Sequence, residues 1–71
     1  MVNLNCEVLK GTDSELLDKV LEVIDSANAE GCTVINIFTR SEYKRNLIKD
    51  WFGKLNFGVC DVYDGVFEVR W

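Results

Sequence analysis

The segment from Val8 to Glu15 restricts the fold more than any other part of the sequence, because the hydrophobic pattern changes its period there. Before this segment, apolar residues alternate with polar ones from Asn3 to Leu9, which is typical of a half-buried strand. After it, apolar residues recur every three or four positions, which is typical of an amphipathic helix. Gly11 supplies a turn between the two patterns. We therefore predict a strand, a tight turn and a helix in direct succession.

The first predicted helix has clear start and stop signals. Thr12 and Glu15 have the spacing of a capping box, in which the two side chains bond free N–H groups of the first turn. Gly31 is placed to end the helix, because glycine readily adopts the left-handed conformation of the C′ position. The buried stripe predicted between these signals consists of Leu17, Val20, Leu21, Ile24 and Ala27.

The segment Cys32–Phe38 is apolar on both faces and rich in β-branched residues, which indicates a strand inside a sheet. A strand, a helix and a second strand form a βαβ unit, so these two strands should be parallel. Ser41 is a suitable cap for a second helix that runs to about Leu55. The predicted buried stripe of this helix consists of Leu47, Ile48, Trp51, Phe52 and Leu55, with Tyr43 at its head.

The dipeptide Asp64-Gly65 lies between two alternating runs and predicts a hairpin with a type I′ turn. Pairing outward from this turn places Cys60 opposite Val69, with Cys60 facing the core as Val62 does. It also places Asp61 opposite Glu68, although like charges that face each other destabilise a sheet. A divalent cation at this pair would need more oxygen ligands than the sequence offers.

Composition limits the chemistry that the chain can perform. Its 71 residues are predicted to form one small domain, residues 1–71, and a chain of this size buries only about 60% of its unfolded surface. The sequence has no histidine, which is the usual general base and the commonest metal ligand. Its three cysteines are too few, and odd in number, for a disulfide framework. We therefore expect no catalytic constellation, no metal and no cofactor.

Charge and hydropathy bear on where the chain works and what it binds. The net charge of −4 disfavours binding of the whole surface to nucleic acid or to an anionic membrane. No apolar run approaches the ~18 residues of a membrane-spanning helix, and the first residues lack the basic segment of a secretion signal. Reduced cysteines suit the cytosol. We expect a cytoplasmic chain that does not engage a membrane.

The stretch Leu4–Ser14 reads Leu-Asn-Cys-Glu-Val-Leu-Lys-Gly-Thr-Asp-Ser and opens a chain whose predicted order is βαβαββ. This order, with elements of these lengths, resembles the TusA/SirA family of small sulfur-carrier proteins over nearly the whole chain. In that family the first strand and turn typically read Leu-Asp-x-Arg-Gly-Leu-x-Cys-Pro-x-Pro. Leu4 and Leu9 match the apolar anchors. The family's nucleophile falls on Gly11, and its two prolines fall on Thr12 and Ser14.

The resemblance implies an α+β fold, a two-layer βαβαββ sandwich. Its four-stranded sheet would be mixed, with strand order 1-2-4-3, strand four antiparallel to the rest and both helices on one face. The same layout also occurs in the C-terminal domain of a bacterial translation initiation factor. Topology by itself therefore assigns no function.

If both helices cover one face of the sheet, the other face is open. This open face would carry Val34, Asn36, Phe38, Val59, Tyr63 and Val66. An apolar patch of this kind often marks a contact with a partner protein or with a second copy. The competing interpretation is a scatter of apolar residues on the surface of a small protein.

Three basic residues gather at the start of the second predicted helix, namely Arg40, Lys44 and Arg45. With the helix dipole they could hold a phosphate, an acidic peptide or RNA, and the competing interpretation is a solvated helix face. Among the thiols, Cys6 and Cys60 are expected to be buried and inert. Cys32, at the entrance of a strand, is the remaining candidate for a reactive thiol.

The leading hypothesis is a non-catalytic relative of the sulfur-carrier family that acts as a protein-interaction or dimerisation module. One alternative is a sulfur carrier or sulfurtransferase that uses another cysteine, such as Cys32. A second alternative is a module that binds RNA or an anion through the basic start of the second helix, although the net charge disfavours nucleic acid. The residues predicted for binding are Arg40, Lys44, Arg45, Val34, Phe38, Tyr63 and Val66.

Overall fold

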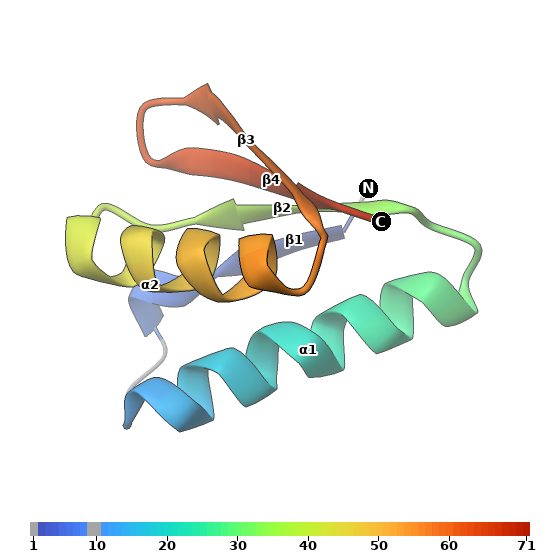
Figure 1. The fold of residues 1–71 in the computed structure, drawn as a ribbon, viewed down its shortest axis with the longest axis horizontal. Helices are drawn as coiled ribbons and strands as arrows, with labels where there is room; N and C mark the ends of the chain where they lie inside the picture. Colours follow the sequence, from blue (N-terminus) through green and yellow to red (C-terminus); the bar gives the residue numbers. More distant parts are fainter. Residues whose placement is uncertain (1, 9–10) are drawn as a thin grey trace.

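The structure is a computed structural model that describes residues 2–8 and 11–71, without the side chain of Val8. Its elements, drawn in Figure 1, are the strands β1 (Val2–Asn5), β2 (Val34–Phe38), β3 (Gly58–Tyr63) and β4 (Val66–Arg70), the helices α1 (Asp13–Ala29) and α2 (Glu42–Lys54), and a 3₁₀ helix η1 (Cys6–Val8). The α+β class predicted from the sequence is confirmed.

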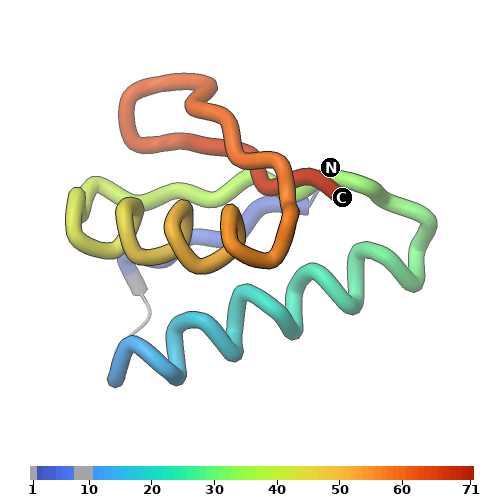
Figure 2. Tube along the Cα trace, viewed as in Figure 1, coloured from blue at the N-terminus to red at the C-terminus, as the bar shows by residue number. Residues whose placement is uncertain are grey.

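The sheet is mixed, and its strands lie in the predicted order β1-β2-β4-β3. β1 pairs parallel to β2, while β4 pairs antiparallel to both β2 and β3. β2 therefore lies inside the sheet, as its apolar sequence indicates. Figure 2 shows that the β3–β4 turn and the connection from β2 to α2 lie at the same end of the sheet.

Alternate residues of the strands face a buried core. Ile35 lies opposite Val69 and Ile37 lies opposite Phe67, and all four side chains are fully buried. We call this side of the sheet the core face and the opposite side the outer face, which contributes no strand residue to the core cluster. That both helices cover one face stays a prediction. The helices add to the same cluster the residues Leu16, Leu17, Val20, Ile24, Ala27, Ile48 and Phe52.

Both helices begin at the predicted caps. The hydroxyl groups of Thr12 and Ser41 each accept a hydrogen bond, at 3.2 Å, from the backbone N–H three residues further on. At the end of α1, Gly31 has a φ of 86°, as predicted for the C′ residue. α2 ends in the same way at Asn56, with a φ of 67°. Asparagine is the residue that most often replaces glycine in this conformation, although no stop signal was predicted at Asn56.

The first strand is shorter than predicted. β1 ends at Asn5, and Cys6–Val8 form a 3₁₀ turn instead of continuing the alternation to Leu9. The cause is local, because the side-chain oxygen of Asn5 accepts a hydrogen bond from the backbone N–H of Glu7 at 2.9 Å. This bond offers the backbone a turn in place of the ladder. Leu9, the predicted strand end, lies outside the described residues, as does the predicted inward side chain of Val8.

The hairpin has the predicted turn residues but not the predicted turn type. Asp64 and Gly65 connect Tyr63 to Val66, which pair as expected. Gly65 has a φ of 79°, whereas Asp64 does not have a positive φ, so the turn is not type I′. A bulge between Asp61 and Tyr63 accompanies this turn and shifts the pairing beyond it by one residue.

The bulge changes which residues of β3 face the core. Cys60 lies opposite Glu68 rather than Val69, and Val59 takes the position opposite Val69 and packs against the core cluster. Val62, at the bulge, is 41% exposed. The predictions that Cys60 and Val62 are buried and that Val59 lies on the open face are therefore wrong. A one-residue slip has this effect because successive strand residues point to opposite faces.

The buried stripe of α2 is narrower than predicted. Ile48 and Phe52 are fully buried, but Trp51 is 44% exposed and Leu55 is 49% exposed. Each residue advances by about 100° around an α-helix. Because Phe52 points into the core, its neighbour Trp51 is turned toward the flank of the helix. The prediction that Trp51 and Leu55 belong to the core is wrong.

Candidate functional site

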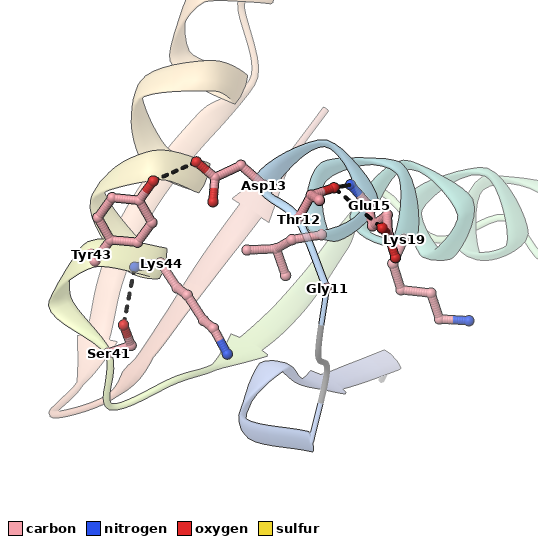
Figure 3. Close-up of a pocket in the computed structure, with 9 residues that line it drawn as sticks. Gly11, Thr12, Asp13, Glu15, Lys19, Ser41, Tyr43 and Lys44 are labelled. Carbon is pink, nitrogen blue, oxygen red and sulfur yellow. Dashed lines mark hydrogen bonds between the residues drawn. The ribbon is translucent and has the colours of Figure 1, made fainter.

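Gly11 and Thr12, which precede α1, border a cavity of about 380 Å³ that lies between the starts of α1 and α2 (Figure 3). We call it the turn cavity. Gly11 has a φ of 131°, and a Cβ atom there would lie 2.5 Å from a carboxylate oxygen of Glu15. Gly11 is the position where the family resemblance expects the nucleophilic cysteine. A cysteine at this position would therefore strain the turn and displace Glu15.

The polar groups around the turn cavity are bonded within the protein. The Tyr43 hydroxyl donates a hydrogen bond to the Asp13 carboxylate, which joins the starts of the two helices (Figure 3). This hydrogen bond and the charge of Asp13 raise the pKa of Tyr43. Lys44 donates to a backbone carbonyl of η1 at 3.1 Å, and Lys19 pairs with Glu22 at 3.4 Å. These bonds indicate a structural role for the groups around the cavity.

A second cavity, of about 450 Å³, lies where the end of β2, the start of α2 and the hairpin turn meet. We call it the arginine cavity, because two arginines from different segments contribute to its wall. Its lining residues are Phe38, Thr39, Arg40, Arg45, Asp64 and Gly65.

Hydrogen bonds of the backbone hold the walls of the arginine cavity. The N–H of Thr39 donates to the carbonyl of Gly65 at 2.8 Å, which ties the end of β2 to the hairpin turn. The buried Thr39 hydroxyl accepts from the N–H of Ser41 at 3.1 Å and so fixes the start of α2. The N–H of Arg40 donates to the Glu7 carboxylate at 2.8 Å. These bonds hold the Arg40 backbone and the start of α2, which carries the second arginine.

The two arginines of this cavity differ in their pairing from the lysine beside them in the sequence. The guanidinium carbon of Arg40 lies 6.0 Å from the centre of the Phe38 ring, at the limit of cation–π contact. Among the residues that the structure describes, neither Arg40 nor Arg45 forms an ion pair, and Asp64 forms none either. The sequence grouped both arginines with Lys44. The structure places Arg40 and Arg45 together and Lys44 in the turn cavity.

A row of apolar residues on the outer face begins at the arginine cavity. Phe38 lies opposite Val66, and Val66 lies opposite Tyr63, so the row crosses β2, β4 and β3. Phe38 and Val66 are half-buried, whereas Tyr63 is 74% exposed. We call these three residues the aromatic row. Because Phe38 also lines the arginine cavity, the row and the cavity are continuous.

The rest of the outer face is more polar than predicted. Val34, the remaining apolar residue predicted there, is half-buried and lies opposite Arg70. Arg70 and Glu68 form an ion pair at 2.7 Å. The other positions of this face, read from the strand register, are Asn3, Asn5, Asn36, Gly58 and Cys60. The predicted apolar patch is therefore reduced to the aromatic row and Val34.

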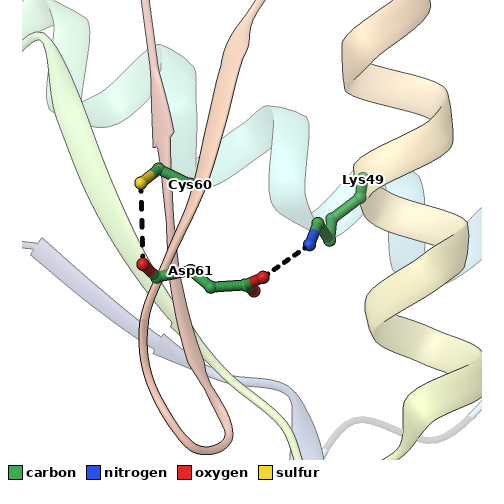
Figure 4. A network of polar contacts seen from close by, with 3 residues as sticks. All are labelled: Lys49, Cys60 and Asp61. Atoms are coloured by element: carbon green, nitrogen blue, oxygen red, sulfur yellow. Dashed lines mark hydrogen bonds and ion pairs between the residues drawn. The ribbon is translucent and has the colours of Figure 1, made fainter.

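The three cysteines are free, and none of them lines the turn cavity or the arginine cavity. Cys6 is buried as predicted, and burial raises its pKa from 9.0 to about 11, which suppresses the reactive thiolate. Cys32 is half-buried just before β2. Cys60 is exposed on the outer face, with its sulfur 3.5 Å from the carbonyl oxygen of Asp61 (Figure 4).

Asp61 pairs with a helix residue instead of facing Glu68. The Lys49 ammonium lies 2.9 Å from the Asp61 carboxylate and links α2 to β3 (Figure 4). This hydrogen bond lowers the pKa of Asp61. The predicted like-charge pair is wrong, because the bulge places Asp61 opposite Phe67. Within residues 2–8 and 11–71, no three His, Cys, Asp or Glu side chains are grouped to hold a metal ion.

The contribution of Asp64 and Gly65 to the arginine cavity was missed, although the sequence contained a signal for it. In the strand order 1-2-4-3, the end of β2 lies beside the start of β4. The residues that follow Phe38 must therefore meet the residues that precede Val66. The strand order implied by the resemblance is thus sufficient to place Arg40 next to the hairpin turn.

No family model, curated protein or solved structure matches this chain. In the described part of the chain, no helix combines the length and the apolar character that crossing a membrane requires. The fold defines a small α+β domain with a mixed sheet of order β1-β2-β4-β3.

Proposed function

We propose that this chain is a non-catalytic protein-interaction module that binds a partner protein through the aromatic row. The observation that carries the proposal is the 74% exposure of Tyr63 in one row with Phe38 and Val66. Aromatic side chains anchor protein interfaces, because they bury a large area and have few rotatable bonds. The row crosses three strands and so presents a continuous strip to a partner.

The proposal includes a relationship to the sulfur-carrier family, with the scaffold kept and its chemistry absent. The observed strand order is the one that the resemblance implies. Two features of the turn support the loss of chemistry. Gly11 stands in the position of the nucleophile, and the side chains around it are bonded to one another rather than directed at a reactive group.

The dimensions of the aromatic row favour a short partner segment. A stable interface typically uses about 20–30 residues on each side. The row has three residues and adjoins one cavity, so the partner should contact it with a short peptide segment. Weak and reversible binding is the expected consequence.

Site-specific photo-crosslinking in the cells that make the protein tests this proposal. A photoreactive benzoylphenylalanine replaces Tyr63 in one variant and Trp51 in a matched control, since both are exposed aromatic residues. We expect a discrete protein adduct from the Tyr63 position that is absent from the Trp51 position. Equal adducts at both positions, or none at Tyr63, would contradict the proposal.

Self-association is a separate version of the same proposal. Sedimentation equilibrium over a wide range of concentrations distinguishes it from binding to another protein. A monomer at every concentration removes the homodimer. A dimer that is lost in Tyr63→Ser, and kept in Trp51→Ser, assigns the aromatic row to a second copy of the chain.

The sulfur-carrier alternative is not favoured by any specific feature of the cysteines. Cys6 is buried with a raised pKa, and neither Cys32 nor Cys60 lines either of the two cavities. Incubation with a persulfide donor, followed by intact mass measurement, should show no stable transfer to the folded protein. A persulfide on Cys32 that is lost in Cys32→Ser would overturn the non-catalytic proposal.

A further inference from the structure

We propose that the arginine cavity binds a carboxylate of the partner protein, so that the recognised segment carries an acidic side chain beside an apolar one. This inference rests on the proposed function and specifies the partner's chemistry. Phe38 is the link, because it lines the arginine cavity and also begins the aromatic row. A partner segment on the row therefore passes directly beside Arg40 and Arg45.

The lining of the cavity carries more positive than negative charge, because it has two arginines and one aspartate. Arg40 and Arg45 form no ion pair with any described residue, although the chain contains 12 acidic residues and only 8 basic ones. A guanidinium group presents a planar fork of N–H donors that matches a carboxylate. Arg45 is half-buried, and its partial removal from water strengthens its attraction for an anion.

A carboxylate fits this cavity better than a phosphate does. Asp64 lines the same cavity and contributes a negative charge. Two arginines and one aspartate give the lining a net charge of +1, which a monoanionic carboxylate neutralises and a dianionic phosphate would exceed. A nucleic acid would also bring a row of phosphates against a chain whose net charge is −4. The cavity therefore selects an acidic side chain over a nucleic-acid backbone.

The remaining walls of the cavity suit the stem of an acidic side chain. The cavity, of about 450 Å³, has room for more than a carboxylate group. The Phe38 ring forms an apolar wall beside the Arg40 guanidinium. Gly65 adds no side chain beside this ring, where a Cβ would lie 3.6 Å from the Phe38 ring. An acidic side chain can thus place its methylene groups on Phe38 and its oxygens at the arginines.

The test is a nuclear magnetic resonance titration of the full, ¹⁵N-labelled chain with N-acetyl-leucyl-glutamine amide and N-acetyl-leucyl-glutamate amide. The two probes differ in one side-chain charge. We expect saturable amide shifts at Arg40, Arg45 and Gly65 with the glutamate probe, and binding weaker by about tenfold with the glutamine probe. Equal affinities would overturn the proposal.

Matched variants assign the binding to the arginines. Arg40→Gln and Arg45→Gln should each weaken binding of the glutamate probe by about tenfold. Lys54→Gln is the control, because Lys54 lies on α2 as Arg45 does. Its side chain is exposed and is already paired with Asp50. Amide spectra of each variant verify that it is folded. Unchanged affinity in both arginine variants would overturn the proposal.

Two further arms separate this proposal from its competitors and from the proposed function. A single-stranded RNA oligonucleotide or inorganic phosphate that shifts the same amides at lower concentration than the glutamate probe would overturn the choice of a carboxylate. A photo-crosslink at position 63 that persists in the Arg40→Gln/Arg45→Gln double variant would also overturn it. That last result would leave the proposed interaction through the aromatic row standing.

Discussion

The turn cavity and the arginine cavity both lie at the start of a helix, but their polar groups are arranged differently. In the turn cavity, Asp13 is bonded to Tyr43, and Lys44 is bonded to a backbone carbonyl. In the arginine cavity, Arg40 and Arg45 have no ion pair among the described residues. Groups that bond each other stabilise the fold, whereas cations without an ion pair beside an apolar row remain available to a ligand. The two cavities therefore differ in whether their charged groups are paired, and this difference is the basis for proposing the arginine cavity as the binding site.

The largest loss in the free energy of unfolding is expected for Gly65→Val, a change in the wall of the arginine cavity. Gly65 has a φ of 79°, which a β-branched residue rarely adopts, and strain of this kind costs about 1–3 kcal/mol. Urea unfolding measures the loss. Gly53→Ala is the matched control, since nothing lies near a Cβ there, and it should stabilise α2 by about 0.5–1 kcal/mol. A Gly65→Val protein as stable as the wild type would refute the described turn.

Thr12→Ala and Arg45→Gln compare one residue of each cavity directly. Loss of the Thr12 cap should destabilise the protein by about 1 kcal/mol, because a backbone N–H of α1 loses its acceptor. Arg45→Gln should change the free energy of unfolding by less than about 0.5 kcal/mol, because no ion pair is lost. Thr12→Ser, which keeps the hydroxyl, should restore most of the stability. An equal loss in Arg45→Gln would show that Arg45 is structural.

Alkaline pH should weaken the bond that joins the two helix starts. The hydrogen bond to Asp13 and its charge raise the Tyr43 pKa above the ordinary value of 10.0. The folded state then holds the proton more tightly, so this stabilisation is present below the unfolded-state pKa and is lost as pH rises through the folded-state pKa. Urea midpoints of the wild type should therefore fall more steeply above pH 10 than those of Tyr43→Phe. Parallel pH profiles would contradict the bond.

The smallest effect is expected for the Lys49–Asp61 pair, which lies outside both cavities. Its hydrogen bond lowers the Asp61 pKa below 3.8, so the stabilisation is present above that pH and is lost as pH falls through the folded-state pKa. Lys49→Met should give a slightly flatter acid limb in urea midpoints measured against pH. Exposed pairs contribute little, so a large change would indicate a role for Lys49 beyond this pair.

The sequence predicted those parts of the fold that depend on local pattern. The helical periods, the caps at Thr12 and Ser41, and the stop at Gly31 are all set by neighbouring residues. The end of β1 was missed, because the Asn5 side chain competes with the strand ladder for a backbone N–H. The register of β3 was missed because turn type and bulge are coupled, and the dipeptide Asp64-Gly65 does not determine the turn type by itself.

The candidate site was predicted in pieces. Arg40, Arg45 and Phe38 were all named from the sequence, but the arginines were assigned to the helix and Phe38 to the open sheet face. Lys44 was separated from Arg45 because adjacent helix residues point about 100° apart. The exposure of Cys60 could not be foreseen without the bulge. Local pattern therefore identified the residue types, and tertiary geometry decided which of them meet.

One titration tests whether the arginine cavity is open to a carboxylate and the turn cavity is not. N-acetyl-leucyl-glutamate amide is added to the labelled chain, and the amide shifts of both cavities are followed in the same spectra. We expect saturable shifts at Arg45 and Gly65, with none at Gly11 or Tyr43. Saturable shifts at Gly11 and Tyr43, or no saturable shift at Arg45 and Gly65, would contradict it.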